Sequence, residues 1–254
     1  MHSILAVLYR EYKIRTSNYL VMVFYDLCLP MGYLMVFGAG LAGVTQNHVA
    51  WGGSELPYSA YLLAGVLAMT SFGSGMGAAW GFITDRDNGI FYEFLTYPMR
   101  RGQFLFGKIL FNGSMSVGRG ILTVVAAGLV LHVAVRPDML PLLLAGVVIG
   151  TIGWFFFLSI FALRIRRNDA FYTLMDLFYF FLLFSSSAFY PLDSMPAWLR
   201  HLSFANPLTW QADFLRYASL GIGNGQRLAM EAAGFCVFAA VSFWAAAREL
   251  SRKE

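Results

Sequence analysis

Six long apolar stretches are the feature that most constrains how this chain folds. Each is about as long as the ~20 residues that a helix needs to cross a membrane. They cover residues 19 to 41, 57 to 83, 106 to 132, 139 to 163, 170 to 190 and 229 to 247. Hydrophobic residues make up 58% of the chain and charged residues only 13%, well below the charged share of soluble domains. The sequence therefore predicts an all-α integral membrane protein with six transmembrane helices in one domain, residues 1 to 254.

Positive charge is distributed unevenly between the two sides of this predicted bundle. With the N-terminus inside, thirteen cationic residues are cytoplasmic: Arg10, Lys13, Arg15, Arg86, Arg100, Arg101, Lys108, Arg164, Arg166, Arg167, Arg248, Arg252 and Lys253. Only four lie outside: Arg136, Arg200, Arg216 and Arg227. This asymmetry follows the positive-inside rule and places both termini in the cytosol. We expect the membrane to be a plasma membrane, the bacterial inner membrane. The excess of basic residues therefore indicates how the chain is oriented in the membrane, and it does not indicate nucleic-acid binding.

The first seventeen residues differ from the apolar stretches that follow. Ile4, Leu8 and Tyr12 recur at helical spacing among charged residues, which predicts an amphipathic helix on the membrane surface over residues 1 to 17. Because an uninterrupted apolar core and a small-residue cleavage site are missing, we expect this segment to be retained rather than removed as a signal peptide.

Residues 191 to 228 are too apolar for a solvated loop and too interrupted for a full span. Helix start signals precede residues 197 to 204 and 208 to 220, and glycines follow the second segment. We therefore expect a re-entrant helical hairpin between the fifth and sixth spans, buried in protein at membrane depth. Its candidate residues are Pro191, Pro196, Trp198, Asn206, Pro207 and Arg216.

A charged and then amphipathic segment, residues 84 to 103, separates the second and third spans. Ile90, Phe91, Phe94 and Leu95 sit at helical spacing and form an apolar face for a groove on a partner protein. The charged residues of the segment provide exposed rim charges that set the orientation of such a contact: Asp85, Arg86, Asp87 and Glu93. The alternative is a solvated loop with incidental charges.

The spacing of Gly89, Glu93, Leu95 and Pro98 in this segment resembles the cytoplasmic coupling segment of ABC-2 type transporter permeases. Later stretches resemble the same family in the same order: Phe189-Tyr-Pro-Leu-Asp-Ser-Met-Pro-Ala-Trp-Leu, then Asn206-Pro-Leu-Thr, then Leu215-Arg216. Asn88 stands where many members have a basic residue.

The resemblance implies the permease subunit of an ATP-driven exporter that moves amphipathic cargo such as a drug, lipid, glycolipid or polysaccharide intermediate. It implies two copies of an ATP-binding subunit, a second permease subunit in a homodimer, and membrane lipid around both. The coupling residues are then Asp85, Arg86, Asp87, Gly89, Phe91, Glu93, Phe94, Leu95 and Pro98. ATP and magnesium would be bound by the partner subunit, with no cofactor on this chain.

Two phosphate-loop patterns stand in contexts that do not suit nucleotide binding. Residues 38 to 43 spell GxGxxG but follow an apolar helix instead of a strand. Residues 102 to 108 spell GxxxxGK, with Ile109 in the place of the magnesium-binding Ser or Thr. The histidines are scattered, so the sequence predicts no metal site and no catalytic residue.

Three charged residues lie within the predicted spans, where they are costly and mark functional candidates: Asp26, Arg119 and Asp176. Asp26 and Asp176 lie about two turns from the cytoplasmic end, so they are candidates for the inner mouth of a pathway, and Arg119 is placed to pair with Asp26. Structural ion pairing is the alternative for each. Ser185, Ser186 and Ser187 favour the fifth span as a pathway wall, although serines also serve helix packing.

Glycines recur every four residues in the second span, at Gly73, Gly77 and Gly81, and again at Gly146 and Gly150 in the fourth. Such stripes let another helix approach closely, either within this chain or across a subunit contact.

A second class of function stays open at this point. A proton-coupled secondary transporter would use Asp26 and Asp176 as proton carriers, although the sequence shows no duplicated half or paired broken spans. A membrane-embedded enzyme is a weaker alternative, because no cluster of His, Cys or carboxylate residues converges.

Overall fold

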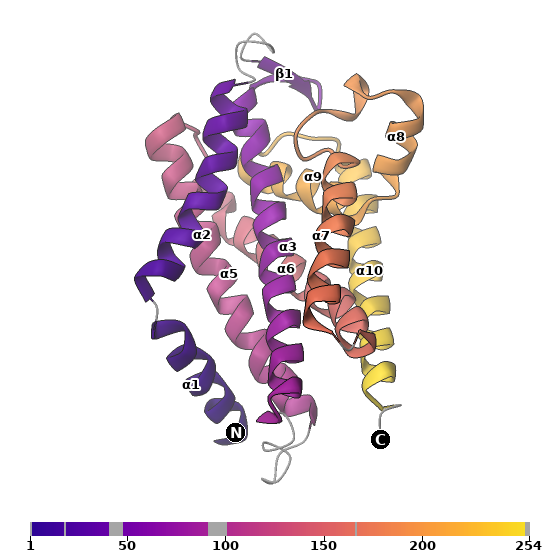
Figure 1. Cartoon of the computed structure of the whole chain (residues 1–254). Coiled ribbons are helices and arrows are strands. Elements are labelled where there is room, and N and C mark those ends of the chain that lie inside the picture. Colours follow the sequence, from indigo (N-terminus) through magenta and orange to yellow (C-terminus); the bar gives the residue numbers. More distant parts are fainter. Residues whose placement is uncertain (1, 18, 41–47, 91–100, 166, 252–254) are drawn as a thin grey trace.

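Four long apolar helices form the body of the molecule, seen in a computed structural model that describes residues 2–17, 19–40, 48–90, 101–165 and 167–251 (Figure 1). They are α3 (Tyr58–Asp87), α5 (Arg101–Leu131), α6 (Leu140–Arg164) and α10 (Gly225–Ser251). By length and composition, four helices among the described residues are able to cross a membrane, and they coincide with the predicted second, third, fourth and sixth spans. The prediction of a multi-pass helical membrane protein is therefore confirmed.

The predicted first and fifth spans correspond to shorter helices. α2 (Tyr19–Tyr33) contains Pro30 and continues as a π-helical stretch, η1 (Leu34–Ala39). α7 (Asn168–Phe184) has 17 residues and ends before the predicted limit at residue 190. At a rise of 1.5 Å per residue, α7 is roughly 25 Å long, less than the ~30 Å apolar core of a bilayer.

Hydroxyl groups explain why α7 ends early. Ser185 Oγ donates to the carbonyl of Phe181, and Ser186 Oγ donates to the carbonyl of Leu183, each at 2.7 Å. Side-chain bonds of this kind compete with the backbone ladder and favour a turn. The chain therefore leaves the helix at the serines that the sequence analysis had placed inside the fifth span.

The core lies where α3, α6 and α9 (Pro207–Leu220) meet. A Cβ atom built at Gly75 of α3 would lie 2.8 Å from the Phe155 nitrogen of α6, so these helices touch backbone to backbone. At Gly150 of α6, a Cβ would lie 1.8 Å from Gln211 Nε2 of α9. Gln211 in turn accepts a hydrogen bond from the buried Trp154 indole at 2.8 Å. Gly150 thus has the close-packing role that the sequence predicted for the fourth span.

The upper end of the molecule in Figure 1 carries a short hairpin, the exception to the all-α prediction. β1 (His48–Trp51) pairs antiparallel with β2 (Ser54–Pro57), and Trp51 lies opposite Ser54. Gly52 and Gly53 make the turn at φ values of +61° and +82°, which favour glycine. A 3₁₀ turn, η2 (Pro137–Met139), joins α5 to α6 at the same end.

Two short helices, α8 (Ala197–Phe204) and α9, follow the 3₁₀ turn η3 (Leu192–Ser194), within the region predicted to be a hairpin. Asn206 caps α9, because its Oδ1 accepts from the Leu208 N–H at 2.9 Å, and Pro207 occupies the first helical position. Ser194 does not cap α8: its hydroxyl donates to the Pro191 carbonyl, and Pro196 stands at the helix start.

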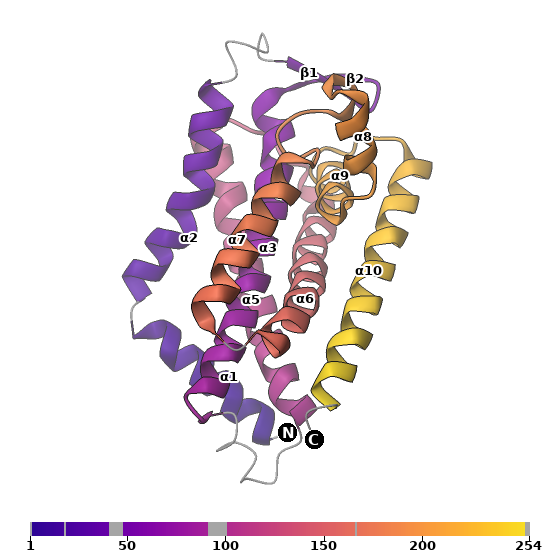
Figure 2. The ribbon, with the colours of Figure 1, turned by 45° about the vertical axis from the view of Figure 1, so that its right-hand side comes forward.

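The lower end in Figures 1 and 2 holds α1 (His2–Thr16) and the end of α10, so both ends of the chain lie at the same end of the bundle. α1 lies beside α5, and a Cβ at Gly107 of α5 would meet Val7 at 2.9 Å. Leu5, Tyr9 and Tyr12 of α1 are each more than half exposed, which leaves an apolar stripe on its outer side.

Candidate functional site

A cleft of about 900 Å³ opens among α1, α2, α3, α5 and α7. In Figure 1, α2 and α7 lie on either side of α3. The cleft is lined by all three charges predicted within the membrane, Asp26 of α2, Arg119 of α5 and Asp176 of α7. The structure therefore brings together residues that lie far apart in the sequence.

Asp26 and Arg119 form the ion pair that the sequence analysis predicted. Arg119 Nε lies 3.0 Å from Asp26 Oδ1, and Arg119 Nη1 donates to Ser74 Oγ of α3 at 2.7 Å. Arg15, at the end of α1, pairs with the second oxygen of Asp26. Arg119 thus connects α5 to both α2 and α3, and Asp26 is held between two guanidinium groups.

A second group of charges, which we call the lower charge cluster, consists of Arg10, Glu11, Asp85 and Lys108. Asp85 of α3 lies 2.5 Å from both Arg10 Nη2 of α1 and Lys108 Nζ of α5. Glu11 lies 3.1 Å from Arg10 and 3.2 Å from Lys108. Asp85 is 4% exposed and Lys108 is 2% exposed, so these two charges are almost completely removed from solvent. It fixes the last turn of α3 to α1 and α5.

The predicted rim charges of the coupling segment have different surroundings. Asp85 is internal, which corrects its assignment as an exposed rim charge. Arg86 donates to the carbonyls of Ala162 and Ile165 at 3.1 and 3.4 Å, near the C-terminal end of α6, where a cation is favourable. Asp87 is 34% exposed and pairs with Arg86 at 3.0 Å. Asp85 and Arg86 therefore position helices.

The chain turns sharply just after these charges. α3 ends at Asp87, and Gly89 adopts a φ of +73°, a left-handed conformation that favours glycine at this position after a helix. The Gly89 N–H donates to the Arg86 carbonyl at 3.1 Å. The other predicted coupling residues, Phe91, Glu93, Phe94, Leu95 and Pro98, lie outside the described residues.

One face of α7 forms a wall of the cleft, with Tyr172, Asp176 and Tyr179 all lining it. The Tyr172 ring lies 5.6 Å from the Trp80 ring of α3, and the Tyr179 ring stacks on Phe72 of α3 at 4.4 Å. α7 thus contributes these three residues to the wall of the cleft, whereas the prediction of a pathway wall was based on its serines.

The serines that led to this prediction have another role. Ser186 and Ser187 are 0% and 1% exposed and lie in the turn beyond the end of α7. Their assignment as pathway-lining groups was wrong, because their hydroxyls bind the Leu183 carbonyl and Asp213.

The glycine stripe of the second span faces the cleft. Gly73, Gly77 and Gly81 all line it, and a Cβ built at Gly73 or Gly77 has no atom within 4 Å among the described residues. The stripe therefore does not serve helix packing within the described chain. It widens the cleft instead.

A different polar group, which we call the upper network, consists of Tyr61, Ser187, Asp213 and Arg216. The guanidinium of Arg216 is completely buried and lies 3.7 Å from the centre of the Tyr61 ring. It pairs with Asp213 and donates to Ser187 Oγ at 3.0 Å and to the Ala188 carbonyl at 3.3 Å. Arg216 thereby ties α9 to α3 and to the turn after α7.

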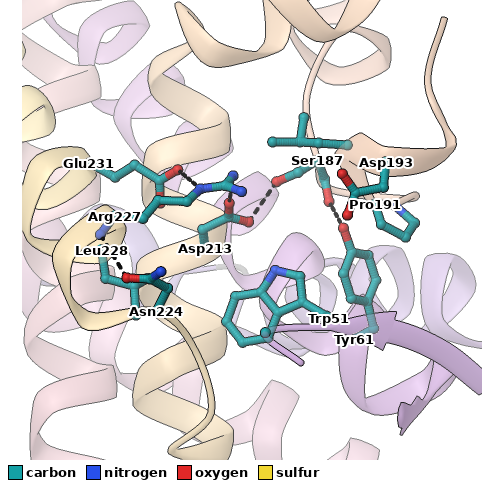
Figure 3. A pocket seen from close by; sticks show the side chains of 12 residues that line it. Trp51, Tyr61, Ser187, Pro191, Asp193, Asp213, Asn224, Arg227, Leu228 and Glu231 are labelled. Carbon is teal, nitrogen blue, oxygen red and sulfur yellow. Dashed lines mark hydrogen bonds and ion pairs between the residues drawn. The ribbon is translucent and has the colours of Figure 1, made fainter. Parts of the chain in front are cut away.

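The upper network borders a small cavity of about 80 Å³, shown in Figure 3. Tyr61 Oη donates to the Ser187 carbonyl at 2.6 Å, and Ser187 Oγ donates to Asp213 Oδ1 at 2.8 Å. Arg227 of α10 closes the other side, 2.9 Å from Asp213 Oδ2. Of the residues predicted for this region, Pro191 lines the cavity and Trp198 points away from the core, with 67% of its surface exposed.

Several of these residues escaped sequence reasoning. Asp213 carried one usable signal, since it precedes Arg216 by three residues on a predicted helix and such pairs face each other. The partnership of Asp85 with Lys108 joins distant segments and leaves no local signal. Lys108 completes the GxxxxGK pattern, and the structure places residues 102 to 108 inside the continuous helix α5 with the Lys108 amine in the lower charge cluster.

Comparison with known proteins agrees with this architecture. The family model for the ABC-2 type transporter matches residues 2–220. The chain is 26% identical over 215 residues to the "Putative transport permease ycf38" of Cyanophora paradoxa, which covers 84% of this chain and 73% of that protein. It is 27% identical over 206 residues to the protein of the same name in Porphyra purpurea, covering 74% of this chain and 64% of that protein.

Proposed function

This chain belongs to the ABC-2 type transporter family, and from that premise we propose that it is the permease subunit of an exporter driven by a separate ATP-binding subunit. The observation that carries the proposal is the connection between the cleft and the end of α3. Asp85, which is held in the lower charge cluster, lies four residues before the Gly89 turn. A displacement of the segment after Gly89 would therefore reach α1 and α5 through buried ion pairs.

The proposed docking element is the segment that begins at this turn, within residues 84 to 103. Phe91, Phe94 and Leu95 would be buried anchors on the ATP-binding subunit, with Glu93 as a positioning charge and Pro98 ending the segment. Binding energy at interfaces concentrates in a few buried aromatic and aliphatic anchors, and rim charges mainly set orientation. ATP and magnesium would be held by the ATP-binding subunit.

The proposed arrangement in the membrane has six spans, made by α2, α3, α5, α6, α7 and α10. The short α7 would complete its crossing together with the turn that follows it. α1 would lie on the cytosolic surface, where its exposed apolar stripe meets lipid. The segment 191 to 228 would re-enter from the outside, and the amphipathic α8, whose Trp198 and Leu202 are more than half exposed, suits the outer interface.

A homodimer of this chain with two ATP-binding subunits is the proposed assembly, in a bacterial inner membrane with both termini in the cytosol. Exposed apolar side chains on α7, among them Leu177, Phe180 and Phe181, provide a surface that either a second copy or lipid would cover. Closure of the ATP-binding subunits would switch the spans between inward-open and outward-open states, and amphipathic cargo would move through the cleft.

The alternative, a proton-coupled secondary transporter, requires a carboxylate that gains and loses a proton during transport. Asp26 is poorly suited, because its two oxygens are already engaged by Arg15 and Arg119. The proton mechanism would then depend on Asp176 alone.

Purification of the tagged full chain from its own membranes tests the proposal. We expect an ABC ATP-binding subunit to co-purify, and the reconstituted complex to transport cargo only with hydrolysable ATP. Phe94→Ala should release the ATP-binding subunit, and Glu93→Ala should keep it bound but uncouple hydrolysis from transport. Ser194→Ala, at the opposite end, is the matched control. Transport that follows a proton gradient without ATP would instead establish the alternative.

A further inference from the structure

All but one of the charged side chains that line the cleft contact a side chain of opposite charge. Arg10, Glu11, Asp85 and Lys108 form the lower charge cluster, with two charges of each sign. Above it, Arg15 and Arg119 share the carboxylate of Asp26, so each of these side chains also contacts an opposite charge. Within the part of the chain that the structure describes, Asp176 has no ion pair or hydrogen bond from its side chain. A carboxylate at this depth is costly in lipid unless water or a counter-charge reaches it.

Aromatic rings flank Asp176 on both sides along α7. Tyr172 lies four residues before it and Tyr179 three residues after it, so all three share one helix face. Each tyrosine is paired with an aromatic ring of α3, Tyr172 with Trp80 at 5.6 Å and Tyr179 with Phe72 at 4.4 Å. The carboxylate thus lies between two aromatic pairs that line the same cleft.

This combination matches the chemistry of a lipophilic cation. A cation is attracted to the faces of Trp and Tyr rings, and the effect grows when water is excluded. An unpaired carboxylate adds a charge contact that an anionic ligand would find repulsive. Each arginine and the lysine of the cleft already contacts a carboxylate of Glu11, Asp26 or Asp85, whereas the carboxylate of Asp176 is left for a ligand.

Space for a ligand of this kind is available beside Asp176. The open surfaces at Gly73 and Gly77 widen the cleft on the α3 side, and its volume of about 900 Å³ lies at the upper end of the range for sites that hold drug-sized molecules. Trp80 and Tyr172 are both more than a third exposed, so their rings are reachable from the cleft.

We propose that Asp176, between the Trp80–Tyr172 and Phe72–Tyr179 ring pairs, binds the positive charge of a lipophilic organic cation, which makes such cations the cargo class. The cargo part of this inference rests on the proposed transport function. The binding part does not, because it concerns only groups of this chain.

Binding to the purified full chain in nanodiscs, without ATP or an ATP-binding subunit, tests the inference. The probe is radiolabelled tetraphenylphosphonium, and binding to empty nanodiscs is subtracted. We expect saturable binding that weakens ~10-fold or more in Asp176→Asn, the scale of one partly screened charge contact. Asp176→Glu should retain most of the affinity. Asp169→Asn, on the same helix but outside the cleft, should bind like the wild type.

Two further measurements guard against a trivial loss of binding. Trp80→Leu should weaken binding about threefold while keeping the carboxylate, as expected for one exposed cation–π contact. Tetraphenylborate, an anion of closely similar shape, should not displace the probe from the wild type. Unchanged probe affinity in Asp176→Asn, or displacement by tetraphenylborate as effective as by unlabelled tetraphenylphosphonium, would overturn the inference.

Failure of the inference and failure of the proposed function give different results. If the ATP-binding subunit co-purifies and drives transport but the probe does not bind, the cation site is wrong and the exporter stands. If the probe binds through Asp176 but transport ignores ATP, the cation site stands and the ATP-driven mechanism is wrong.

Discussion

The upper network and the cleft are both polar regions within an apolar bundle, but they satisfy their charges differently. Arg216 is completely buried, and its guanidinium is surrounded by Tyr61, Asp213 and the turn after α7. The cleft is larger by about an order of magnitude in volume and leaves the Asp176 carboxylate without a partner in the described chain. The satisfied polar groups of the upper network hold their helices in place, whereas the carboxylate without a partner in the cleft can still bind another molecule.

Helix α3 runs through both regions and shows the same contrast in its glycines. A Cβ at Gly65 would lie 2.3 Å from the Ala188 carbonyl oxygen beside the upper network. One at Gly77 would face open space in the cleft. The same residue type thus permits close packing on one part of the helix and creates volume on another.

Removing the central guanidinium of the upper network should have the largest effect on stability. Arg216→Met leaves the Asp213 carboxylate buried with a half-exposed Arg227 as its remaining charged partner, and breaking a buried ion pair typically costs about 3 to 5 kcal/mol. We expect a strongly lowered melting temperature in detergent and poor yield. Arg136→Met, an exposed arginine at the same end, is the control. Equal melting of both variants would contradict a structural role for the network.

Glycine substitutions should separate the two parts of α3. Gly65→Ala forces a methyl group against backbone that cannot move aside, and overpacking of this kind costs about 1 to 3 kcal/mol. Gly77→Ala should leave stability unchanged or slightly raised, because alanine favours the helix by up to ~1 kcal/mol. Thermal unfolding of the two variants, side by side, provides the test. A larger loss for Gly77→Ala would show that the stripe is packed after all.

A cleft variant should affect function more than folding. Asp26→Asn removes the partner of Arg15 and Arg119 in a region that water can reach, so the expected stability loss is about 1 kcal/mol. ATP-driven transport should fall much further, because the pair joins α2 to α5 across the pathway. Melting temperature and transport are measured on the same preparation. Normal transport by this variant would remove Asp26 from the mechanism.

The smallest effect is expected for an exposed pair at the upper end. The hydrogen bond from Arg136 lowers the pKa of Asp138. Any contribution of this carboxylate to folding stability is therefore present at neutral pH and disappears as the pH falls through the lowered pKa. Both side chains are about half exposed, and solvent screens the pair. Asp138→Asn should therefore melt like the wild type at about pH 7 and about pH 4. A clear pH-dependent difference would mean that this loop contacts another surface.

Local sequence signals predicted much of this architecture. Hydrophobic length located α3, α5, α6 and α10, and the Asn206-Pro207 dipeptide marked the start of α9 because its capping chemistry is contained within three residues. The Asp26–Arg119 pair was also predictable, because few charges lie within the apolar stretches and opposite charges at such depth seek each other.

Other features depended on tertiary contacts that leave no local trace. Asp85 reads as a surface charge, since it begins a polar segment, but Arg10 and Lys108 reach it from two other helices. The serines after Phe184 have the composition of a polar helix face, and only their hydrogen bonds show that they end α7. A glycine stripe shows where a helix is smooth, but not whether a helix or a cavity faces it.

The central claim is that the cleft is a pathway whose opening is controlled by ATP on a partner subunit. Its most direct test is thiol accessibility at Gly77→Cys, in a background where the exposed Cys28 and Cys236 are replaced by serine. In the reconstituted complex we expect fast labelling from the cytosolic side without nucleotide. Labelling should slow by ~10-fold or more when ATP is trapped with vanadate, as expected for a population shift between two states. Asp138→Cys, labelled from the outside as a control, should react equally in both conditions. A Gly77→Cys labelling rate that ignores nucleotide would contradict the account.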